Sequence, residues 1–219
     1  MPYDFLATDD TVRSFSDIDL LINYATIERD NGHEDRRKLF LKLAIVSSVT
    51  KFQVFIESVL KEYLYHLKSC QKNYSEVSIH LRLNALKLYT SSTIIHKNLE
   101  NPEGYNRDKL TEVKRYADQA LKICNDNLII ADEITIETKF PMGKTGLSEL
   151  SKLFRQINGE DIFANPPFDI NRLNEILGRR HAIVHEDSNP QVTEQTVQNY
   201  RNYLVLVIEY VDQYLANYK

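Results

Sequence analysis

The sequence predicts an all-α fold. Only six glycines and six prolines occur in 219 residues. Most of them lie between segments with helical periodicity, which favours long helices over a turn-rich β fold. Residues 35–68 carry the strongest helical pattern, because this run contains neither Gly nor Pro and its apolar residues recur at intervals of three and four. Together these observations predict a helical bundle that forms one domain over residues 1–219.

The other helices follow from caps and periodicity. Ser16 can cap a first helix that runs to about Asn31, with Asp19 near its positive N-terminal end. After the long helix at 35–68, periodic segments predict five more helices. Their expected ranges are 75–97, 107–126, 147–157, 170–186 and 193–217.

Two segments stand apart from this helical pattern. The run LIIADEITIETKF is rich in β-branched residues and partly alternating, so we expect a small extended or β-hairpin insertion near 128–140. Residues 1–33 are interpreted as an N-terminal helical extension, for which the sequence indicates no role.

Composition limits the partners and the compartment. The net charge of −4 and the pI near 5.9 give no general attraction to nucleic acid, so any RNA-binding surface has to be a local patch. Cys70 and Cys124 have no metal or redox spacing and are expected to be reduced, buried thiols. The first twenty residues are acidic, and no apolar run approaches the roughly 20 residues that cross a bilayer. We therefore expect a soluble cytoplasmic protein without a membrane partner.

Two sequence patterns resemble ligand sites but lack essential residues. The triplet GKT at 143–145 has no glycine at the earlier position that a phosphate-binding loop requires. His181 and His185 have the four-residue spacing of metal ligands on one helix, but Ala182 stands where the zinc-protease motif has Glu. No third His or Cys lies nearby in the sequence, so we expect no metal and no cofactor.

One arginine falls inside the apolar stripe of the helix predicted at 170–186. With residues placed at steps of about 100°, as the helical turn requires, five apolar side chains fall within about 60° of Arg180. They are Leu173, Ile176, Leu177, Ile183 and Val184. His181 and His185 lie together on one flank of the stripe. An unpaired guanidinium there would cost several kcal/mol, so Arg180 needs a partner or a ligand.

A carboxylate occupies a similar position in the long helix. Glu57 lies in line with the apolar residues of 35–68, and a buried carboxylate invites pairing with a buried guanidinium. The residues alone leave two interpretations open. An Arg180–Glu57 ion pair fixes the register of two helices and nothing more, or Glu57 aims an Arg180 that binds a ligand.

Residues 180–185, RHAIVH, resemble the signature of the HEPN superfamily, which is an arginine, a polar residue, three further residues and a histidine. The context LNEILGRRHAIVHEDSNPQVT, followed by a final helix, is similar to the RiboL-PSP and MAE-type branches of that superfamily. The long helix with its central Glu57 and the segment GLSELSKLFRQI are similar too. The resemblance covers most of residues 36–217, and residues 1–33 lie outside it.

The resemblance implies a HEPN-like helical bundle that forms a homodimer, in which the two motif helices face each other across a cleft. Many HEPN proteins are metal-independent endoribonucleases that act as toxins or effectors in antiphage defence and toxin–antitoxin systems. Both signature positions are intact here, so the chain is expected to cleave RNA. The 2′-hydroxyl beside the scissile phosphate would be the nucleophile, and a 2′,3′-cyclic phosphate would be left.

The residue types suit this chemistry. Histidine titrates near neutral pH, so His185 is the expected general acid or base. Arg180 stays cationic and can hold two phosphate oxygens. His181 is expected to orient a phosphate or relay a proton, and Arg179 to contact the RNA backbone. Glu57 would aim Arg180 from behind.

Two other functions remain open. Some HEPN proteins have lost catalysis, so the motif could serve a non-catalytic module for dimerisation and partner binding. Alternatively, the chain could be a toxin that an antitoxin or a sensor protein holds inactive or modifies. The sequence gives neither the RNA target nor the identity of such a partner.

Overall fold

The computed structural model describes residues 3–92, 107–130, 134–140, 146–185 and 191–219, and the chain folds into two compact units. Unit 1 comprises Met1–Tyr63, Thr138–Ser151 and Ile162–Lys219, and unit 2 comprises Leu64–Glu137 and Lys152–Asp161. Helices form both units, and the described residues contain no β-strand, which confirms the all-α prediction. A domain can contain more than one compact unit, so the single domain expected over residues 1–219 stays a prediction.

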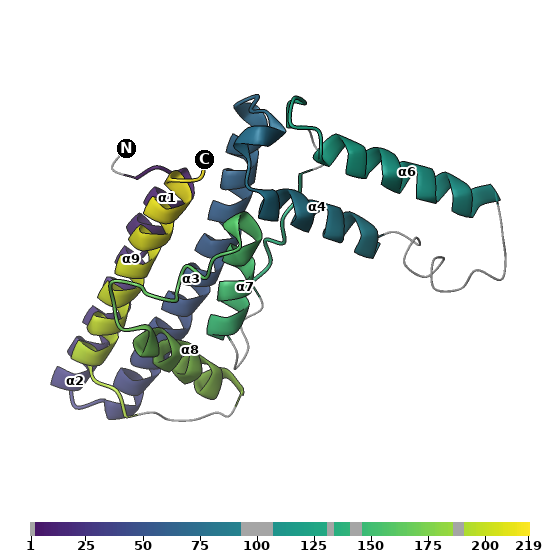
Figure 1. Ribbon diagram of the computed structural model, residues 1–219. Helices are drawn as coiled ribbons and strands as arrows, with labels where there is room; N and C mark the ends of the chain where they lie inside the picture. The colour runs from purple at the N-terminus through teal and green to yellow at the C-terminus, as the bar shows by residue number, and fades with distance from the viewer. Residues whose placement is uncertain (1–2, 93–106, 131–133, 141–145, 186–190) are drawn as a thin grey trace. The chain divides into compact units, whose positions relative to one another are not determined.

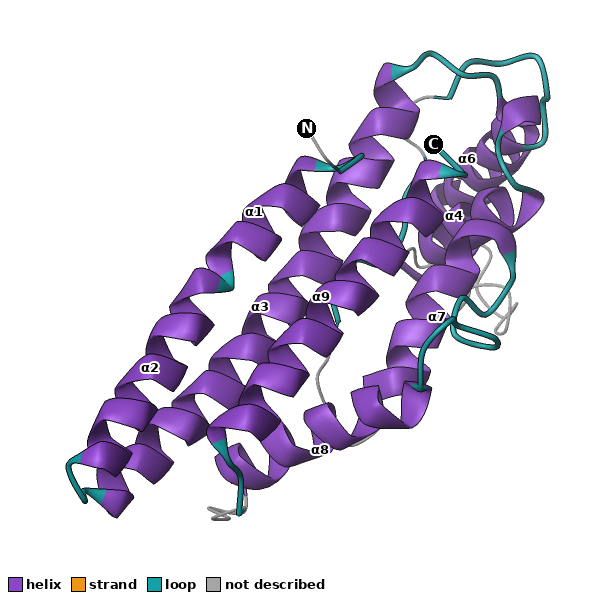
Figure 2. Cartoon of the chain, turned by 90° about the vertical axis from the view of Figure 1, so that its left-hand side faces the viewer, coloured by secondary structure: helices purple, strands orange, loops and turns teal. Residues whose placement is uncertain are grey.

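Unit 1 is a helical bundle. Its helices are α1 (Leu6–Ser14), α2 (Ser16–Asp30), α3 (Glu34–Ser69, as far as Tyr63), α8 (Ile170–His185) and α9 (Glu194–Ala216). Figure 2 shows α1 and α2 following one another alongside α3 and α9, while α8 crosses one end of the bundle. Large apolar side chains fill the space between these helices. Those that are fully buried include Phe15, Ile18, Ile45, Phe52, Phe55, Ile56, Leu204 and Ile208.

Helix α3 provides much of this core. Among the described helices it alone is long and apolar enough to cross a membrane, which the sequence interpretation had not expected of any segment. The core helix of a soluble protein passes the same test, and the apolar side chains of Val49, Phe52 and Ile56 have no exposed surface. The structure is consistent with a soluble protein, and a cytoplasmic location stays a prediction.

Unit 2 contains the 3₁₀ turn η1 (Tyr74–Glu76), α4 (Ile79–Ser92), α6 (Arg107–Ile123) and the last residues of α7 (Gly146–Asn158). Helix α4 packs against α6 (Figure 1). Cys70 and Cys124 both lie in this unit as free, exposed thiols, so the expectation that they are buried is wrong.

The predicted helices are present within a few residues of their expected ends. In place of the single helix predicted at 75–97, the structure has η1 followed by α4. Residues 93–97 lie outside the described residues. The described residues of the insertion near 128–140 form neither a helix nor a strand, and only an isolated antiparallel bridge joins Ile129 to Asn73. The hairpin alternative is therefore wrong for these residues. The GKT triplet at 143–145 lies outside the described residues.

Helix α1 lies within the helical extension predicted at 1–33, but it was not placed as a separate helix, because distant carboxylates stabilise its start. Its N-cap residue, Phe5, makes no side-chain capping bond. Instead, the buried carboxylate of Asp212 on α9 accepts hydrogen bonds from the backbone of Phe5, at 3.1 Å, and from the hydroxyl of Thr8, at 2.6 Å. Glu62 on α3 accepts from the backbone N–H groups of Leu6 and Ala7, at 2.8 and 2.9 Å. The donors that a helix start leaves unpaired are thus satisfied by α3 and α9.

Candidate functional site

Helix α8 carries the predicted motif, and its start is fixed by local caps. The side chain of Asp169 accepts a hydrogen bond from the backbone N–H of Asn171 at 3.0 Å, as an N-terminal capping residue does. The hydroxyl of Tyr203 on α9 donates to the Asp169 carbonyl at 2.7 Å. Gly146 lies so close that a Cβ there would stand 2.8 Å from Leu177 Cδ1. These contacts set α8 against α9 and the start of α7.

One face of α8 is buried as the helical projection predicted. Leu173 and Ile176 have no exposed surface, and Leu177 has 6%. The apolar stripe becomes more exposed toward the C-terminal end of α8, where Ile183 is half-buried and Val184 is 44% exposed. The buried turns of α8 therefore hold the helix in place, while its last turn reaches the surface.

The two motif histidines lie against each other at this end. The ring centroids of His181 and His185 are 4.7 Å apart with an interplanar angle of 42°. His181 is half-buried, and its Nδ1 atom is buried without a hydrogen-bond partner among the described residues. His185 is exposed. The structure thus brings together an exposed imidazole and a second one whose ring nitrogen is unpaired.

Arg180 is half-buried beside them, and its Nε atom is also buried without a partner. No ion pair joins it to Glu57 in the part of the chain that the structure describes, so the expected bridge is not formed. Glu57 Oε1 accepts from Gln53 Nε2 at 3.2 Å and from the backbone N–H of Phe140 at 3.3 Å. Glu57 therefore holds the extended segment at Phe140, and the guanidinium of Arg180 keeps unused donors.

Arg179 is held on the opposite edge of α8. Its Nε donates to Glu175 Oε1 at 3.1 Å, and its guanidinium lies over the ring of Tyr200, 5.8 Å from the centroid. The Tyr200 hydroxyl donates a short hydrogen bond to the same Glu175 oxygen. This bond, with help from Arg179, lowers the pKa of Glu175, while burial and the bond to Glu175 raise the pKa of Tyr200 to about 12.

Sequence reasoning missed Glu175 and Tyr200. The four-residue spacing of Glu175 and Arg179 was a usable signal, because side chains at that spacing meet on one side of a helix. Tyr200 gave no such signal, since α9 supplies it from 25 residues away.

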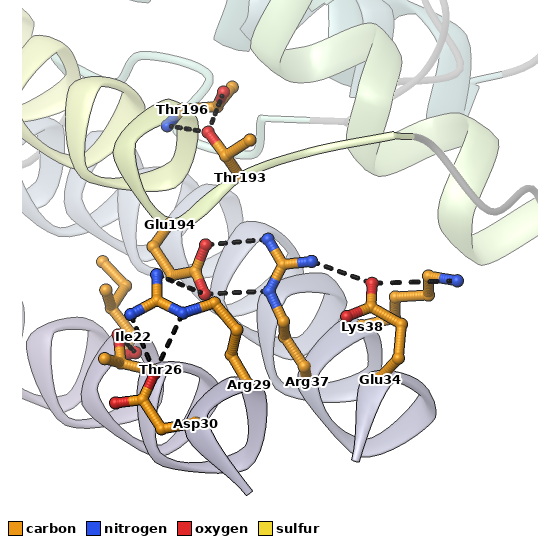
Figure 3. A network of polar contacts seen from close by, with 10 residues as sticks. All are labelled: Ile22, Thr26, Arg29, Asp30, Glu34, Arg37, Lys38, Thr193, Glu194 and Thr196. Atoms are coloured by element: carbon orange, nitrogen blue, oxygen red, sulfur yellow. Dashed lines mark hydrogen bonds and ion pairs between the residues drawn. The ribbon is translucent and has the colours of Figure 1, made fainter. Parts of the chain in front are cut away.

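A charged network fixes the start of α9, the helix that follows the motif (Figure 3). Arg37 on α3 donates two hydrogen bonds of 2.8 Å to the two carboxylate oxygens of Glu194, and a third to Glu34. Arg29 on α2 adds a contact of 3.6 Å to Glu194. The hydrogen bonds from Arg37 lower the pKa of Glu194 to about 2, and the bond to Glu194 raises the pKa of Arg37. Three helices are thereby joined at one end of unit 1.

The described residues outside the motif contain a groove but no metal site. Among the described residues, no group of three His, Cys, Asp or Glu side chains could hold a metal ion. An open groove lies between α1 and α3, lined by Thr11, Ser14, Thr50, Val54 and their neighbours, and it contains none of the predicted site residues.

The comparison with protein families decides the affiliation. A model of the RiboL-PSP-HEPN family matches residues 12–217, nearly the whole chain. The chain belongs to the RiboL-PSP-HEPN family. The match includes α2 and starts before residue 36, where the resemblance noted in the sequence began. No curated protein and no solved structure matches the chain significantly. HEPN domains are often ribonucleases, so the affiliation supports a nuclease-type function in general terms.

Proposed function

We propose that this HEPN protein is a metal-independent endoribonuclease whose active site is built on the last turns of α8. The observation that carries the proposal is the pairing of His181 with His185 beside an Arg180 that has no carboxylate partner among the described residues. A structural arginine in a bundle is normally paired, because an unpaired buried guanidinium is costly. Arg180 is instead left with donors that a phosphate can accept from.

The chemistry needs only groups that α8 provides. RNA carries its own nucleophile, the 2′-hydroxyl, so the enzyme has to move protons and stabilise the charge that develops on the phosphorane. His185 is exposed and can take a proton from the 2′-hydroxyl or give one to the leaving oxygen. Arg180 binds the phosphate oxygens, and His181 orients His185 through their ring contact.

We further propose that two copies assemble through α8. The motif of a single copy contains one exposed histidine, His185, whereas proton removal and proton donation require a group on each side of the phosphate. The exposed face of α8 suits close approach, since a Cβ built at Gly178 meets no atom within 4 Å and Val184 is 44% exposed. In such a homodimer, each copy would contribute an Arg180 and a His185 to a shared cleft.

In the cell, we propose a toxin or an effector of antiphage defence, controlled by an antitoxin or a sensor protein. This role extends the family affiliation and carries less support than the chemistry. An uncontrolled ribonuclease would degrade the RNA of its own host, so a controlling partner is expected. Co-purification of the chain with the product of an adjacent gene tests this part.

The chemical proposal is tested by incubating the purified protein with single-stranded RNA in excess chelator. We expect cleavage without divalent ions, with products ending in a 2′,3′-cyclic phosphate and a 5′-hydroxyl. Substrates with a 2′-deoxy or 2′-methoxy sugar at the scissile position should resist cleavage, because the nucleophile is absent. The product ends are identified by mass spectrometry.

Two results would contradict the proposal. Activity that disappears in chelator and returns with magnesium or zinc would require a metal-activated water. A folded dimer that cleaves no RNA would favour a non-catalytic module for dimerisation and partner binding.

A further inference from the structure

The edge of α8 that faces α9 carries two arginine–tyrosine pairs. The Cζ atom of Arg172 lies 5.6 Å from the centroid of the Tyr203 ring, and Arg179 Cζ lies 5.8 Å from that of Tyr200. Both distances are within the range of cation–π contacts. Both rings are buried, so the guanidinium groups cover ring faces that solvent would otherwise reach. The arginines are two helical turns apart, about 10 Å along the axis.

Stacking leaves the donors of Arg172 available, whereas Arg179 already donates its Nε–H to Glu175. The guanidinium of Arg172 makes no hydrogen bond or ion pair with any side chain in the described ranges. Glu175, three residues further on, accepts instead from Arg179 and Tyr200. A guanidinium stacked on a ring still presents its N–H groups around the edge of its plane, where they can grip two oxygens of a phosphate. Arg172 is thus a fixed cation with unused donors.

The same helix carries the motif, and the charge of α8 differs from that of the chain. Within α8, three arginines stand against one glutamate, whereas the whole chain has a net charge of −4. On a helical projection, His181 and Arg172 lie on opposite edges of the exposed face, with Gly178 and its open surroundings between them. Glu175 also lies between these edges, and the partner copy would cover part of this face in the proposed dimer, so a strand bound at the motif reaches the second edge beside the partner, within about one helix diameter.

We propose that the Arg172–Tyr203 and Arg179–Tyr200 pairs form a ledge that binds the backbone of single-stranded RNA flanking the cleavage site. The inference rests on the proposed ribonuclease function of α8 and extends it to residues outside the motif. Phosphate contacts of this kind fix the register of a strand without reading its sequence. The ledge therefore favours longer strands over short ones and does not select particular bases.

Binding to an uncleavable strand tests the ledge directly. The probe is a fluorescein-labelled 2′-methoxy RNA of about twelve nucleotides, a length typical of single-strand sites, with a labelled trinucleotide for comparison. By fluorescence anisotropy, Arg172→Gln should weaken binding of the longer strand about fivefold, since it removes a phosphate contact. The slope of log affinity against log salt should become shallower by about 0.7, the value for one contact on a single strand. Trinucleotide binding should not change.

Arg201 provides the matched control. Its guanidinium also lies over an aromatic ring, 5.8 Å from the centroid of Phe15, and it pairs with Asp19 at 3.1 Å on the side of α9 that faces α2. Arg201→Gln should leave RNA affinity and the salt slope unchanged. Arg172→Lys keeps the charge without the planar grip and should fall between Arg172→Gln and the parent.

Unchanged binding and salt slope in Arg172→Gln would overturn the ledge, and so would an equal loss in Arg201→Gln. If Arg172→Gln melts at a lower temperature, its salt slope measured well below that temperature decides, because a purely structural role would not make the slope shallower. Failure of the ledge is distinguishable from failure of the ribonuclease. If the protein binds RNA through Arg172 but cleaves none, the ledge proposal stands and the ribonuclease proposal is wrong. If it cleaves RNA but Arg172 does not contribute to binding, only the ledge proposal is wrong.

Discussion

Unit 1 contains two groups of charged side chains that differ in how fully their polar atoms are paired. In the network at the start of α9, the side chains of Arg37 and Glu194 are 14% and 13% exposed, and each guanidinium nitrogen of Arg37 donates to a carboxylate. At the end of α8, Arg180 is half-buried with its Nε unpaired, and His181 has an unpaired Nδ1. The first group holds helices together. The second carries an energetic cost that its own contacts do not offset, which is typical of a site prepared for a ligand.

In a helical bundle, charged groups that serve the fold and charged groups that bind a ligand differ in their pairing. Charged residues that serve the fold are satisfied within it, because leaving them unpaired costs stability. Arg201 on α9 also has a buried, unpaired Nε, but its guanidinium forms an ion pair with Asp19. Arg180 and His181 have unpaired atoms side by side on one helix without an ion pair among the described residues, which a substrate explains better. Substitutions in the two groups should therefore affect different measurements.

The largest effect is expected from His185→Ala. His185 is exposed at the end of α8, so the melting temperature should stay nearly unchanged. RNA cleavage should fall about 10³-fold, the usual contribution of a general acid or base. His33→Ala is the matched control, because His33 is an exposed histidine outside the motif, with its Nδ1 2.7 Å from Glu28 Oε2. Cleavage that survives in His185→Ala would remove the catalytic assignment.

The next effect is expected from Arg180→Ala. Loss of a phosphate-binding cation should lower cleavage about 10²-fold, and Arg180→Lys should recover only part of it, because an ammonium lacks the two-point grip. Since no partner carboxylate is stranded, stability should change little, and Glu57→Gln should leave cleavage intact. Thermal melts and cleavage assays on the same preparations give both quantities. If Arg180→Ala is strongly destabilised but still cleaves RNA when folded, the role of Arg180 is structural and not catalytic.

A smaller effect, on stability alone, is expected from Glu194→Gln. It removes two charge-assisted hydrogen bonds and leaves Arg37 mostly buried, which should lower the free energy of unfolding by about 2 kcal/mol. The control is Asp17→Asn, whose partner Lys51 binds an exposed carboxylate; such a surface pair contributes about 0.5 kcal/mol. Chemical denaturation measures both. If both variants lose the same free energy of unfolding, the network stabilises the fold no more than an exposed ion pair does.

The same network predicts a pH dependence. The pKa of Glu194 is about 2 in the folded chain against an ordinary value of 4.5. A depressed pKa means that the folded state binds its proton less readily than the unfolded state does. The stabilisation is therefore fully present above pH 4.5 and is lost as the pH falls toward about 2. In Glu194→Gln, unfolding in this window should depend less on pH, and an unaltered pH dependence would contradict the assignment.

The smallest effect is expected from Gly178→Ala. A Cβ at this helical position meets no atom within 4 Å, so alanine should stabilise the monomer by about 0.8 kcal/mol through its helix propensity. If two copies approach closely over α8, the added methyl group should at the same time weaken the dimer, which analytical ultracentrifugation can measure. A variant with unchanged dimerisation would move the proposed interface away from Gly178.

The sequence by itself determined the helical class, most helix boundaries and the motif. Periodicity placed α3, α8 and α9 within a few residues, because an amphipathic stripe is a local property of the chain. The RHAIVH run at 180–185 likewise needed no tertiary information. The projection of α8 correctly placed Leu173 and Ile176 in the core.

Only the tertiary structure decided which charges meet. Glu57 was expected to pair with Arg180 because both lie in apolar stripes, yet it binds the backbone of Phe140, and a stripe does not specify the neighbour that covers it. Helix α1 depends on Asp212, more than 200 residues away in the sequence. The Arg37–Glu194 pair spans 157 residues. Such contacts depend on how helices pack, and periodicity along one helix carries no information about the side chains on another.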